Sequence, residues 1–388
     1  MSNYCIISEF NPLHNGHVYL FEQARARGAE TVTCIMSGNS TQRGELAITD
    51  KYERARAAIL CGADLVLELP FPWCSASAEY FALAGVYIAD FFGDTLFFGS
   101  ENGDVEFLGR AADVCADENF KAEYELRTKS GDGSANAFLD CLSKRGFFDI
   151  RSNDLLGISY IKAINASGCS LRPKTTPRIG GDYNDTKRYE DTFSSATAIR
   201  ALIMQGRADE LSKYVPLPMA DILRTEIENG RMTELSEADS AILSYFRLAM
   251  AEDFEGVADA GGGVANRLIN VARQSVSVSD ILEKLSTKRY TDAKMRRAML
   301  YCLTKTKQDF LKTLPTYTTL LGANEKGREL LAKNKKSNGI TVVTKPADAP
   351  KETEQFALSE RLDLFYGLAR KNKLTSESFY QKNAYVVK

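Results

Sequence analysis

The chain has 388 residues, of which 44% are hydrophobic and 26% are charged, and its formal net charge is −2. This length exceeds that of one ordinary domain, and the composition supplies enough apolar residues for a buried core. A near-neutral charge does not indicate a nucleic-acid-binding protein, although basic side chains could still gather on one face. We find no basic leader with an apolar segment and no apolar run long enough to cross a bilayer, so we expect a cytoplasmic protein with no membrane partner.

The eight cysteines are widely separated and form no C-x-x-C pair, which argues against a zinc ribbon or a redox motif. Several lie inside apolar runs, where a cysteine acts as a small hydrophobic side chain. We therefore expect reduced thiols, and we expect no metal centre built from protein side chains alone.

Strand-like and helix-like segments alternate through the first hundred residues. The expected strands are 4–8, 31–36, 63–69 and 94–98. The expected helices are 17–27, 50–61 and 75–91. This alternation predicts an α/β fold with a Rossmann-like parallel sheet and right-handed crossovers. Ligands bind such sheets at the carboxyl ends of the strands, so we expect the functional site in the loops after the first, second and fourth strands.

The α/β pattern continues to residue 200, with a further helix expected over 153–163 and a fifth strand over 170–178. Beyond residue 200 helix-like periodicity dominates, and the C-terminal remainder is expected to pack back on these helices. We therefore predict a catalytic α/β domain over 1–205 and a mainly helical domain over 206–388.

The two histidines of the chain, His14 and His17, lie where the first strand gives way to a helix. Residues three apart share one face of a helix, so both imidazoles can point at one ligand. The first-turn N–H groups of a helix have no intrahelical partner, and the helix dipole favours negative charge there. Gly16 allows the backbone to approach that ligand closely. This pattern predicts a phosphate-binding site.

Two other interpretations of the histidine pair remain open at this point. The pair could be structural, or it could ligate a metal ion. No glutamate lies between the two histidines, as it would in a zincin helix, and the chain has no third histidine. We therefore favour the phosphate role.

Two later segments also suggest function. Residues 193–200 place hydroxyl side chains at the start of an expected helix, where hydroxyls cap free N–H groups and can bind phosphate. Residues 284–312 hold a local excess of Lys and Arg, interleaved with Tyr290 and Tyr301, which could stack on bases. A solvent-exposed charged helix face is the alternative for the second segment. Asn153, at the start of its helix, could be a simple N-cap.

The stretch from Ile6 to His17 resembles the HxGH signature of the nucleotidylyltransferase and class I tRNA-synthetase superfamily. The surrounding residues from Glu9 to His17 resemble the tRNA(Met) cytidine acetate ligase family. Residues 193–200 resemble the second signature of the superfamily, which closes over the triphosphate. Further matches to the ligase family lie at 153–157, 178–180, 266–267 and 288–291. Two positions depart from its pattern, with Ser159 in place of Glu and Lys294 in place of Arg.

The resemblance implies that the catalytic residues are His14 and His17. It implies ATP contacts at Ile7, Ser8, Glu9, Phe10, Asn11, Pro12, His14, Asn15, Gly16, His17, Gly99, Asn153, Arg178, Ser195 and Thr197. It implies RNA contacts at Lys288, Arg289, Lys294, Arg296 and Arg297. Mg²⁺ is expected to arrive with ATP, because this ion is usually held through substrate phosphates.

The resemblance also implies a two-step reaction. Acetate would attack the α-phosphate of ATP to give acetyl-adenylate, and the wobble cytidine of elongator tRNA(Met) would then become N4-acetylcytidine. We expect tRNA and acetate as partners and no DNA. One alternative is an adenylyltransferase that acts on a small phosphorylated metabolite, and another is a non-catalytic nucleotide- or RNA-binding scaffold. No residue can be identified from the sequence as the general base for the cytidine step.

Overall fold

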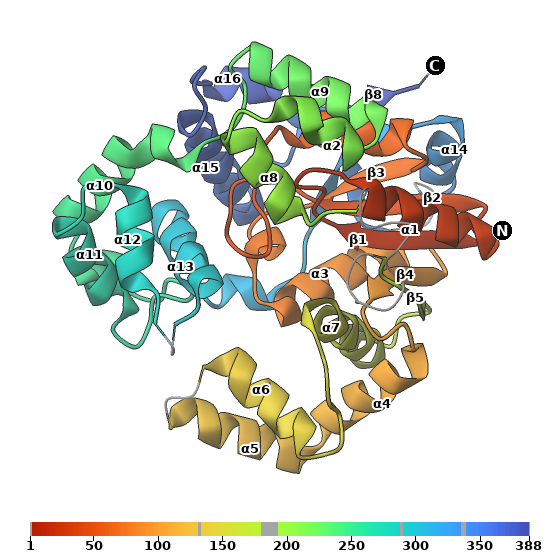
Figure 1. The fold of residues 1–388 in the computed structure, drawn as a ribbon, viewed down its shortest axis with the longest axis horizontal. Helices are drawn as coiled ribbons and strands as arrows, with labels where there is room; N and C mark the ends of the chain where they lie inside the picture. The colour runs from red at the N-terminus through yellow and green to blue at the C-terminus, as the bar shows by residue number, and fades with distance from the viewer. Residues whose placement is uncertain (1, 131–132, 180–192, 288–289, 335–338, 388) are drawn as a thin grey trace.

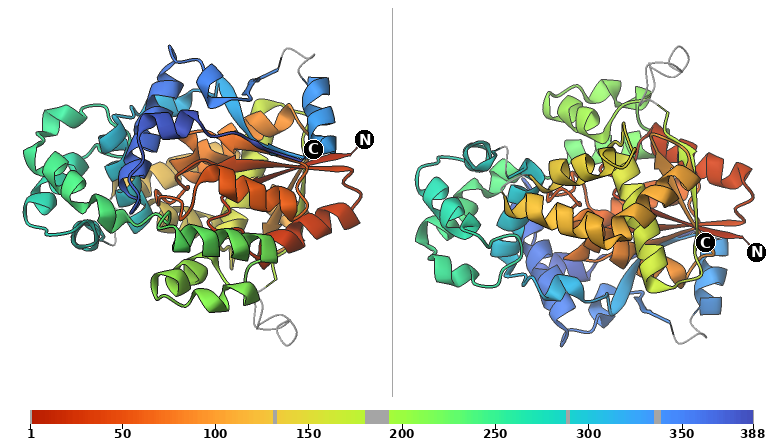
Figure 2. Two further views of the ribbon diagram at one scale, coloured as in Figure 1. Left: turned by 90° about the horizontal axis from the view of Figure 1, so that it is seen from above. Right: turned by 90° about the horizontal axis from the view of Figure 1, so that it is seen from below.

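The computed structural model describes residues 2–130, 133–179, 193–287, 290–334 and 339–387. One mixed sheet forms its centre, with the strand order β5-β4-β1-β2-β3-β6-β7 and with β8 beside β6. The strands are β1 (Asn3–Ser8), β2 (Thr31–Ser37), β3 (Leu65–Leu69), β4 (Thr95–Ser100), β5 (Arg172–Pro177), β6 (Tyr317–Ala323), β7 (Thr341–Val343) and β8 (Tyr385–Val386). Helices cover both faces of this sheet (Figures 1 and 2).

The helices of the first half are α1 (Asn15–Ala26), α2 (Lys51–Leu60), α3 (Ala78–Asp90), α4 (Val105–Ala116), α5 (Glu118–Lys129), α6 (Ser134–Ser143), α7 (Ser152–Ser167) and α8 (Ala196–Met204). Those of the second half are α9 (Leu217–Glu228), α10 (Asp239–Leu248), α11 (Val264–Arg273), α12 (Val278–Leu285), α13 (Asp292–Thr304), α14 (Glu325–Asn334), α15 (Glu354–Leu368) and α16 (Ser376–Tyr380). Among the helices in the described ranges, none is both long enough and apolar enough to span a membrane.

The parallel part of the sheet confirms the predicted α/β fold. β1 pairs in parallel with both β2 and β4, β2 pairs with β3, and β4 pairs with β5. β2 and β3 lie on one side of β1, and β4 and β5 lie on the other side. Open α/β sheets bind ligands in the crevice outside the strand ends at such a change of direction, so we place the candidate site between the loops after β1 and β4.

The expected elements are present, with small shifts at their ends. The first helix begins at Asn15 rather than at residue 17, because His14 caps it. The third helix begins at Ala78 rather than at 75, because residues 73–75 form a separate 3₁₀ turn.

Residues of β1 alternate between the two faces of the sheet. Tyr4 and Ile6 belong to the core packed with α1 and α2, whereas Cys5 and Ile7 belong to the core packed with α3 and α7. Burying a large apolar side chain contributes about 1.5–3 kcal/mol, so this strand is held firmly from both sides. The loop that follows it, which carries the two histidines, therefore starts from a fixed point.

The C-terminal part returns to the sheet, which corrects one expectation. β6 pairs antiparallel with β3, β8 pairs with β6, and α14 contacts β2, β3 and β6. The expectation that the C-terminal remainder packs back on the helical domain is confirmed in part, because α15 contacts α13, whereas β8 joins the sheet. β6 consists of seven buried residues, and nothing in its local sequence indicates that it pairs with β3. The division at residue 205 stays a prediction, although the sheet extends across it.

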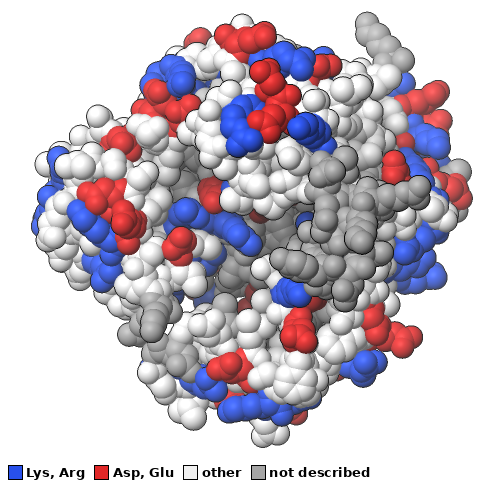
Figure 3. Space-filling view, in the orientation of Figure 1, with Lys and Arg blue, Asp and Glu red and all other residues white. Residues whose placement is uncertain are grey.

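The helical stretch predicted after residue 200 is confirmed in α9 to α13. Helices α10 to α13 lie together at the end of the molecule away from both termini (Figures 1 and 2). A hollow separates them from the helices around the sheet on the face shown in Figure 3, and Lys and Arg side chains lie along it.

Candidate functional site

The two histidines form the N-terminal cap of α1. The Nδ1 atom of His14 accepts a hydrogen bond from the Gly16 N–H at 3.1 Å, and the Nδ1 atom of His17 accepts one from the His14 N–H at 3.1 Å. The two rings stack, with 3.8 Å between their centroids and 29° between their planes. The predicted shared face is therefore present, and the capping hydrogen bonds fix both rings.

These hydrogen bonds also assign the tautomers. Because each Nδ1 accepts, each neutral ring carries its proton on Nε2. Burial and the Arg178 guanidinium lower the pKa of His14 to about 3. Burial, His14 and Arg178 lower the pKa of His17 well below its ordinary value. The site therefore holds two neutral imidazoles, and neither Nε2 has a hydrogen-bond partner among the described residues.

The loop before the histidines is buried and packed. The Phe10 ring lies edge-on to the His17 ring at 4.9 Å between centroids. The Asn11 Oδ1 atom accepts from the Ile48 N–H at 2.8 Å. The buried Asn11 Nδ2 has no hydrogen-bond partner within the described part of the chain. The Glu9 carboxylate accepts from a backbone N–H at 2.6 Å, and burial raises its pKa.

The opposite wall of the crevice comes from β4 and the start of α7. Glu101, just after β4, accepts from the backbone N–H groups of Asn153 and Asp154 at 3.1 and 3.0 Å. It also accepts from Nδ2 of Asn153 at 2.6 Å. The Asn153 Oδ1 atom in turn accepts from Arg178 at 3.4 Å. A Cβ at Gly99 would lie 3.1 Å from the Arg178 side chain.

The structure thus brings Gly99, Asn153 and Arg178 together, and the charge of Arg178 reaches both histidines. The N-cap of α7 is Arg151, so the alternative that Asn153 is a simple N-cap is wrong. Sequence reasoning missed Glu101, although its place at the carboxyl end of a strand was an available signal.

Helix α8 carries the second signature to the histidine loop. The Ser195 Oγ atom caps the helix by accepting from the Ala198 N–H at 3.1 Å. A Cβ at Gly16 would lie 3.9 Å from the Phe193 ring, so this segment lies beside the loop. Thr197 is exposed, and its hydroxyl accepts from Arg200 at 3.4 Å. Phosphate contacts by Ser195 and Thr197 stay predictions.

Asn15 contacts the segment that follows α8. Its backbone N–H donates to the Tyr214 carbonyl at 3.0 Å, and its side-chain amide donates to the Lys213 carbonyl at 3.0 Å. These contacts anchor the start of α1 on the 3₁₀ turn Ala208–Lys213. Its predicted ATP contact is not tested by this arrangement.

The predicted RNA-binding residues are divided among different environments. Lys288 and Arg289 lie outside the described residues. Arg297 on α13 pairs with Asp259 at 3.0 Å, with only 11% of its side chain exposed. Arg296 pairs with Glu45 at 3.2 Å. Lys294 lies over the Tyr290 ring at 5.5 Å and has no ion pair within the described ranges.

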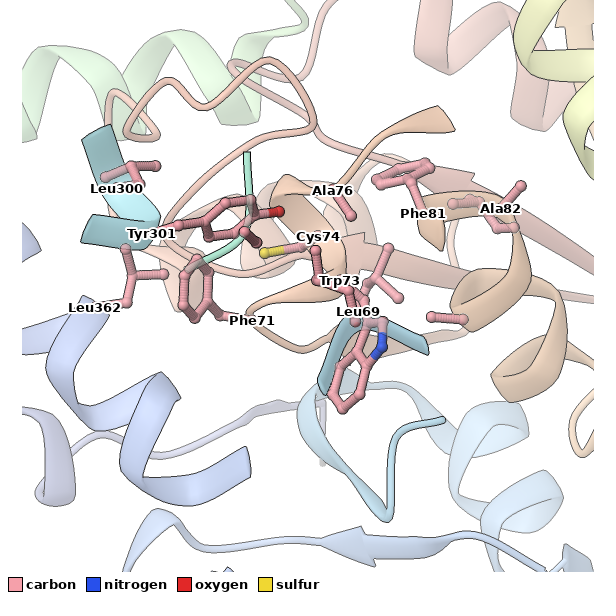
Figure 4. Close-up of a cluster of buried hydrophobic side chains, with 14 of the residues drawn as sticks. Leu69, Phe71, Trp73, Cys74, Ala76, Phe81, Ala82, Leu300, Tyr301 and Leu362 are labelled. Carbon is pink, nitrogen blue, oxygen red and sulfur yellow. The ribbon is translucent and has the colours of Figure 1, made fainter. Parts of the chain in front are cut away.

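Tyr301 does not face solvent, so the expectation that it stacks on RNA bases is wrong. Its side chain is 0% exposed, and its hydroxyl donates to the Ser75 carbonyl at 2.8 Å. Figure 4 shows its ring beside Phe71 among buried side chains. Helix α13 buries more than one face, which the local basic composition did not reveal.

Known proteins resemble this chain along nearly its whole length. The model of a family described as HIGH Nucleotidyl Transferase matches residues 1–382. A tRNA(Met) cytidine acetate ligase of Caldanaerobacter subterraneus is 34% identical and covers 95% of each chain. One from Acetivibrio thermocellus is 35% identical, over 92% of this chain and 91% of its own. The crystal structure of Thermotoga maritima TmcAL bound with alpha-thio ATP has a TM-score of 0.87 and 30% identity over the whole of both chains.

Proposed function

This chain belongs to the HIGH nucleotidyl transferase family and, within it, to the tRNA(Met) cytidine acetate ligases, and we propose that it acetylates the wobble cytidine of elongator tRNA(Met). In this proposal acetate and ATP first react to give acetyl-adenylate and pyrophosphate. The tRNA then accepts the acetyl group, which gives N4-acetylcytidine and AMP.

The first step makes a bond between an acetate oxygen and the α-phosphorus of ATP and breaks the bond to the bridging oxygen of pyrophosphate. Negative charge grows on the phosphates as this bond breaks. The two neutral Nε2–H donors and the dipole of α1 would stabilise that charge without proton transfer. This is the role we assign to His14 and His17.

In the second step the exocyclic amine of cytidine attacks the acetyl carbonyl. The bond between the acetyl carbon and the adenylate oxygen breaks, AMP leaves, and the amine nitrogen loses a proton. Acetate alone would have to expel an oxide, whereas acetyl-adenylate expels AMP. The protein's contribution is then to hold both reactants in line.

Residues on both walls of the crevice would hold the nucleotide. On one side we propose contacts from the Asn11 side chain and from the Gly16 backbone beside the His14 ring. Gly99, Asn153 and Arg178 line the other. The remaining ATP contacts that we propose lie in the same loop and at the start of α8, namely Ile7, Ser8, Glu9, Phe10, Pro12, Asn15, Ser195 and Thr197.

Magnesium would arrive with ATP in this proposal. The described residues hold no group of three His, Cys, Asp or Glu side chains placed as a metal site. Both oxygens of Glu101, the carboxylate at the crevice, are occupied by the start of α7. The donor set therefore fits an ion held mainly by phosphate oxygens and water, which would neutralise charge on the leaving pyrophosphate.

The RNA would lie on the helical side of the hollow. We propose that Lys294 and Arg296 of α13 contact its phosphates, and that residues 206–388 act as the tRNA-binding domain beside a catalytic domain of residues 1–205. The Lys and Arg side chains along the hollow support this placement (Figure 3).

The paired histidines at the start of α1 are the observation that carries the proposal. Its test combines purified protein, ATP, magnesium, labelled acetate and bulk tRNA, with each component omitted in turn. Nucleosides from the recovered tRNA are then analysed for acetylated cytidine. We expect label in tRNA that requires both ATP and acetate.

A His17→Ala protein serves as the matched control and should give little or no label. Release of pyrophosphate without label in tRNA would reject the tRNA acceptor and point to a small phosphorylated metabolite. Unchanged labelling by His17→Ala would reject the catalytic role of the pair.

A further inference from the structure

The Glu45 carboxylate lies between two arginines from distant parts of the chain. Its Oε2 atom accepts from Nη2 of Arg200 at 2.6 Å, and its Oε1 atom accepts from Nη1 of Arg296 at 3.2 Å. The three side chains are only 19% to 28% exposed. Such pairs are screened less by salt than pairs on the open surface. One carboxylate therefore joins α8, which carries the second signature, to α13.

Arg200 extends this connection to the histidine loop. Its Nη1 atom donates to the carbonyl of Asn11 at 2.9 Å, and Asn11 lies three residues before His14. Asn11, Glu45 and Thr197 together engage both terminal nitrogens of the guanidinium. Arg200 therefore stabilises the loop through these hydrogen bonds, and its terminal nitrogens are not left without partners for a phosphate.

The turn that carries Glu45 packs tightly against α13. The Gly44 N–H donates to the Thr41 carbonyl at 2.8 Å, and the Thr41 N–H donates to the Glu45 carbonyl at 2.9 Å. Gly44 has a φ of +73°, and a Cβ there would lie 2.6 Å from the backbone nitrogen of Arg297. A shift of α13 must therefore move this turn.

The same turn reaches the loop after β1. The backbone N–H of Gln42, between Thr41 and Gly44, donates to the Glu9 carboxylate at 2.6 Å. The turn thus contacts α13 at one end and the histidine loop at the other. A change at α13 can therefore reach the histidine loop through this turn.

We propose that Glu45 is a positioning residue that couples RNA binding on α13 to ATP binding, an inference that rests on the proposed function. An RNA phosphate that takes over Arg296 leaves the Glu45 carboxylate to Arg200 alone. The stronger Glu45–Arg200 pair then stabilises the hydrogen bond from Arg200 to the Asn11 carbonyl. This hydrogen bond orders the loop that binds ATP. ATP and tRNA therefore tighten each other's binding by one common factor, because such coupling is reciprocal.

The test measures ATP affinity with and without saturating tRNA, and tRNA affinity with and without ATP. Acetate is omitted, so no reaction follows binding. We expect the wild-type protein to show the same factor in both experiments, about fivefold or more. Glu45→Gln keeps the size of the side chain and removes its charge, so we expect the factor to fall to about one.

Glu123→Gln is the matched control. Glu123 also accepts from two cations, Lys144 and Arg145, and it is similarly exposed, but it lies on α5 away from the site. We expect this variant to keep the wild-type factor. Arg296→Gln removes the other half of the bridge and should lose the coupling as Glu45→Gln does, which gives a second variant if Glu45→Gln unfolds at a lower temperature.

Two results would overturn the inference: a factor of one in the wild-type protein, or a wild-type factor in both Glu45→Gln and Arg296→Gln. Neither result would touch the proposed function if the protein still acetylates tRNA. A wild-type protein that acetylates no tRNA would instead reject the proposed function, whatever the binding data show.

Discussion

His14 and His17 cap the same helix through their Nδ1 atoms, and the His14 backbone N–H is the donor to His17 at 3.1 Å. The cap uses the side of each ring that does not carry the proton. Each ring therefore has two separate tasks, since Nδ1 holds the helix start while Nε2–H remains for a ligand. A substitution that keeps the Nδ1 cap and removes the Nε2–H donor can therefore separate the effect on stability from the effect on ligand binding.

We predict that His17→Ala and His14→Ala each lower turnover by about 10²-fold or more, the usual cost of losing one preorganised donor. His17→Asn is the sharper variant, because its side-chain oxygen can still accept from the His14 N–H while no group replaces Nε2–H. It should lose as much turnover as His17→Ala and keep more of the stability. Steady-state acetylation rates and thermal unfolding measure the two effects, and near-normal turnover in all three variants would contradict the phosphate role.

The low pKa values of the two histidines predict a flat titration. Since the chain holds two histidines, both imidazole C–H signals of the folded protein can be followed by NMR without selective labelling. With the pKa of His14 lowered to about 3 and that of His17 lowered well below its usual range, neither signal should shift between pH 5 and pH 8. A midpoint near 6.5 for either signal would contradict the lowered pKa of that imidazole.

The same pKa shifts predict how stability depends on pH. Below about pH 6.5 the unfolded chain binds protons on both histidines, whereas the folded protein does not. The free energy of unfolding should therefore fall as pH falls from 6.5 toward 5, and His17→Asn should show a smaller decrease. Urea unfolding at several pH values measures it, and an equal decrease in both proteins would show that other groups are responsible.

What the sequence revealed was local. His14, Gly16 and His17 lie within one turn of chain, so their spacing predicted the shared face and placed the helix start within two residues of Asn15. The alternation of strands and helices is also a short-range pattern, and it predicted the parallel sheet and a functional site in the loops after the first, second and fourth strands.

What the sequence did not reveal depends on partners far along the chain. Glu45 meets Arg296 only because the turn after β2 packs on α13, and no periodicity in either segment indicates that contact. Tyr301 was expected to stack on bases, yet it lies in the core beside Phe71 (Figure 4). Composition indicates how many charges a helix carries, whereas tertiary packing decides which of them face solvent.

A buried ion cluster beside the sheet gives a stability prediction. The Lys51 ammonium donates to Glu68 at 2.7 Å and to Asp363 at 3.4 Å, so it joins α2, β3 and α15. Lys51→Met would leave two carboxylates buried without their cation, and we expect a loss of about 3–5 kcal/mol in the free energy of unfolding. Lys121→Met, which breaks an exposed pair with Glu118, should change stability little. Equal unfolding midpoints for the two variants in urea would show that the cluster contributes nothing.

The contacts of α13 predict that its basic residues differ in their effect on RNA. Lys294 has no ion pair among the described residues, so Lys294→Glu should weaken tRNA binding and lower the slope of its salt dependence by about one. Arg297 is bound to Asp259, so Arg297→Glu should mainly reduce stability through two facing carboxylates. Filter binding of labelled tRNA at several salt concentrations, with thermal unfolding of each variant, separates the two effects.

Lys129→Glu provides the control for this comparison, because Lys129 is an exposed lysine on α5 that pairs only with its helix neighbour Glu125. It changes the net charge by the same amount as Lys294→Glu, so it removes any general effect of charge on tRNA affinity. If all three variants lower the salt slope equally, α13 has no special part in RNA binding. If Lys294→Glu alone lowers it, the face of α13 that carries Lys294 contacts RNA phosphates directly.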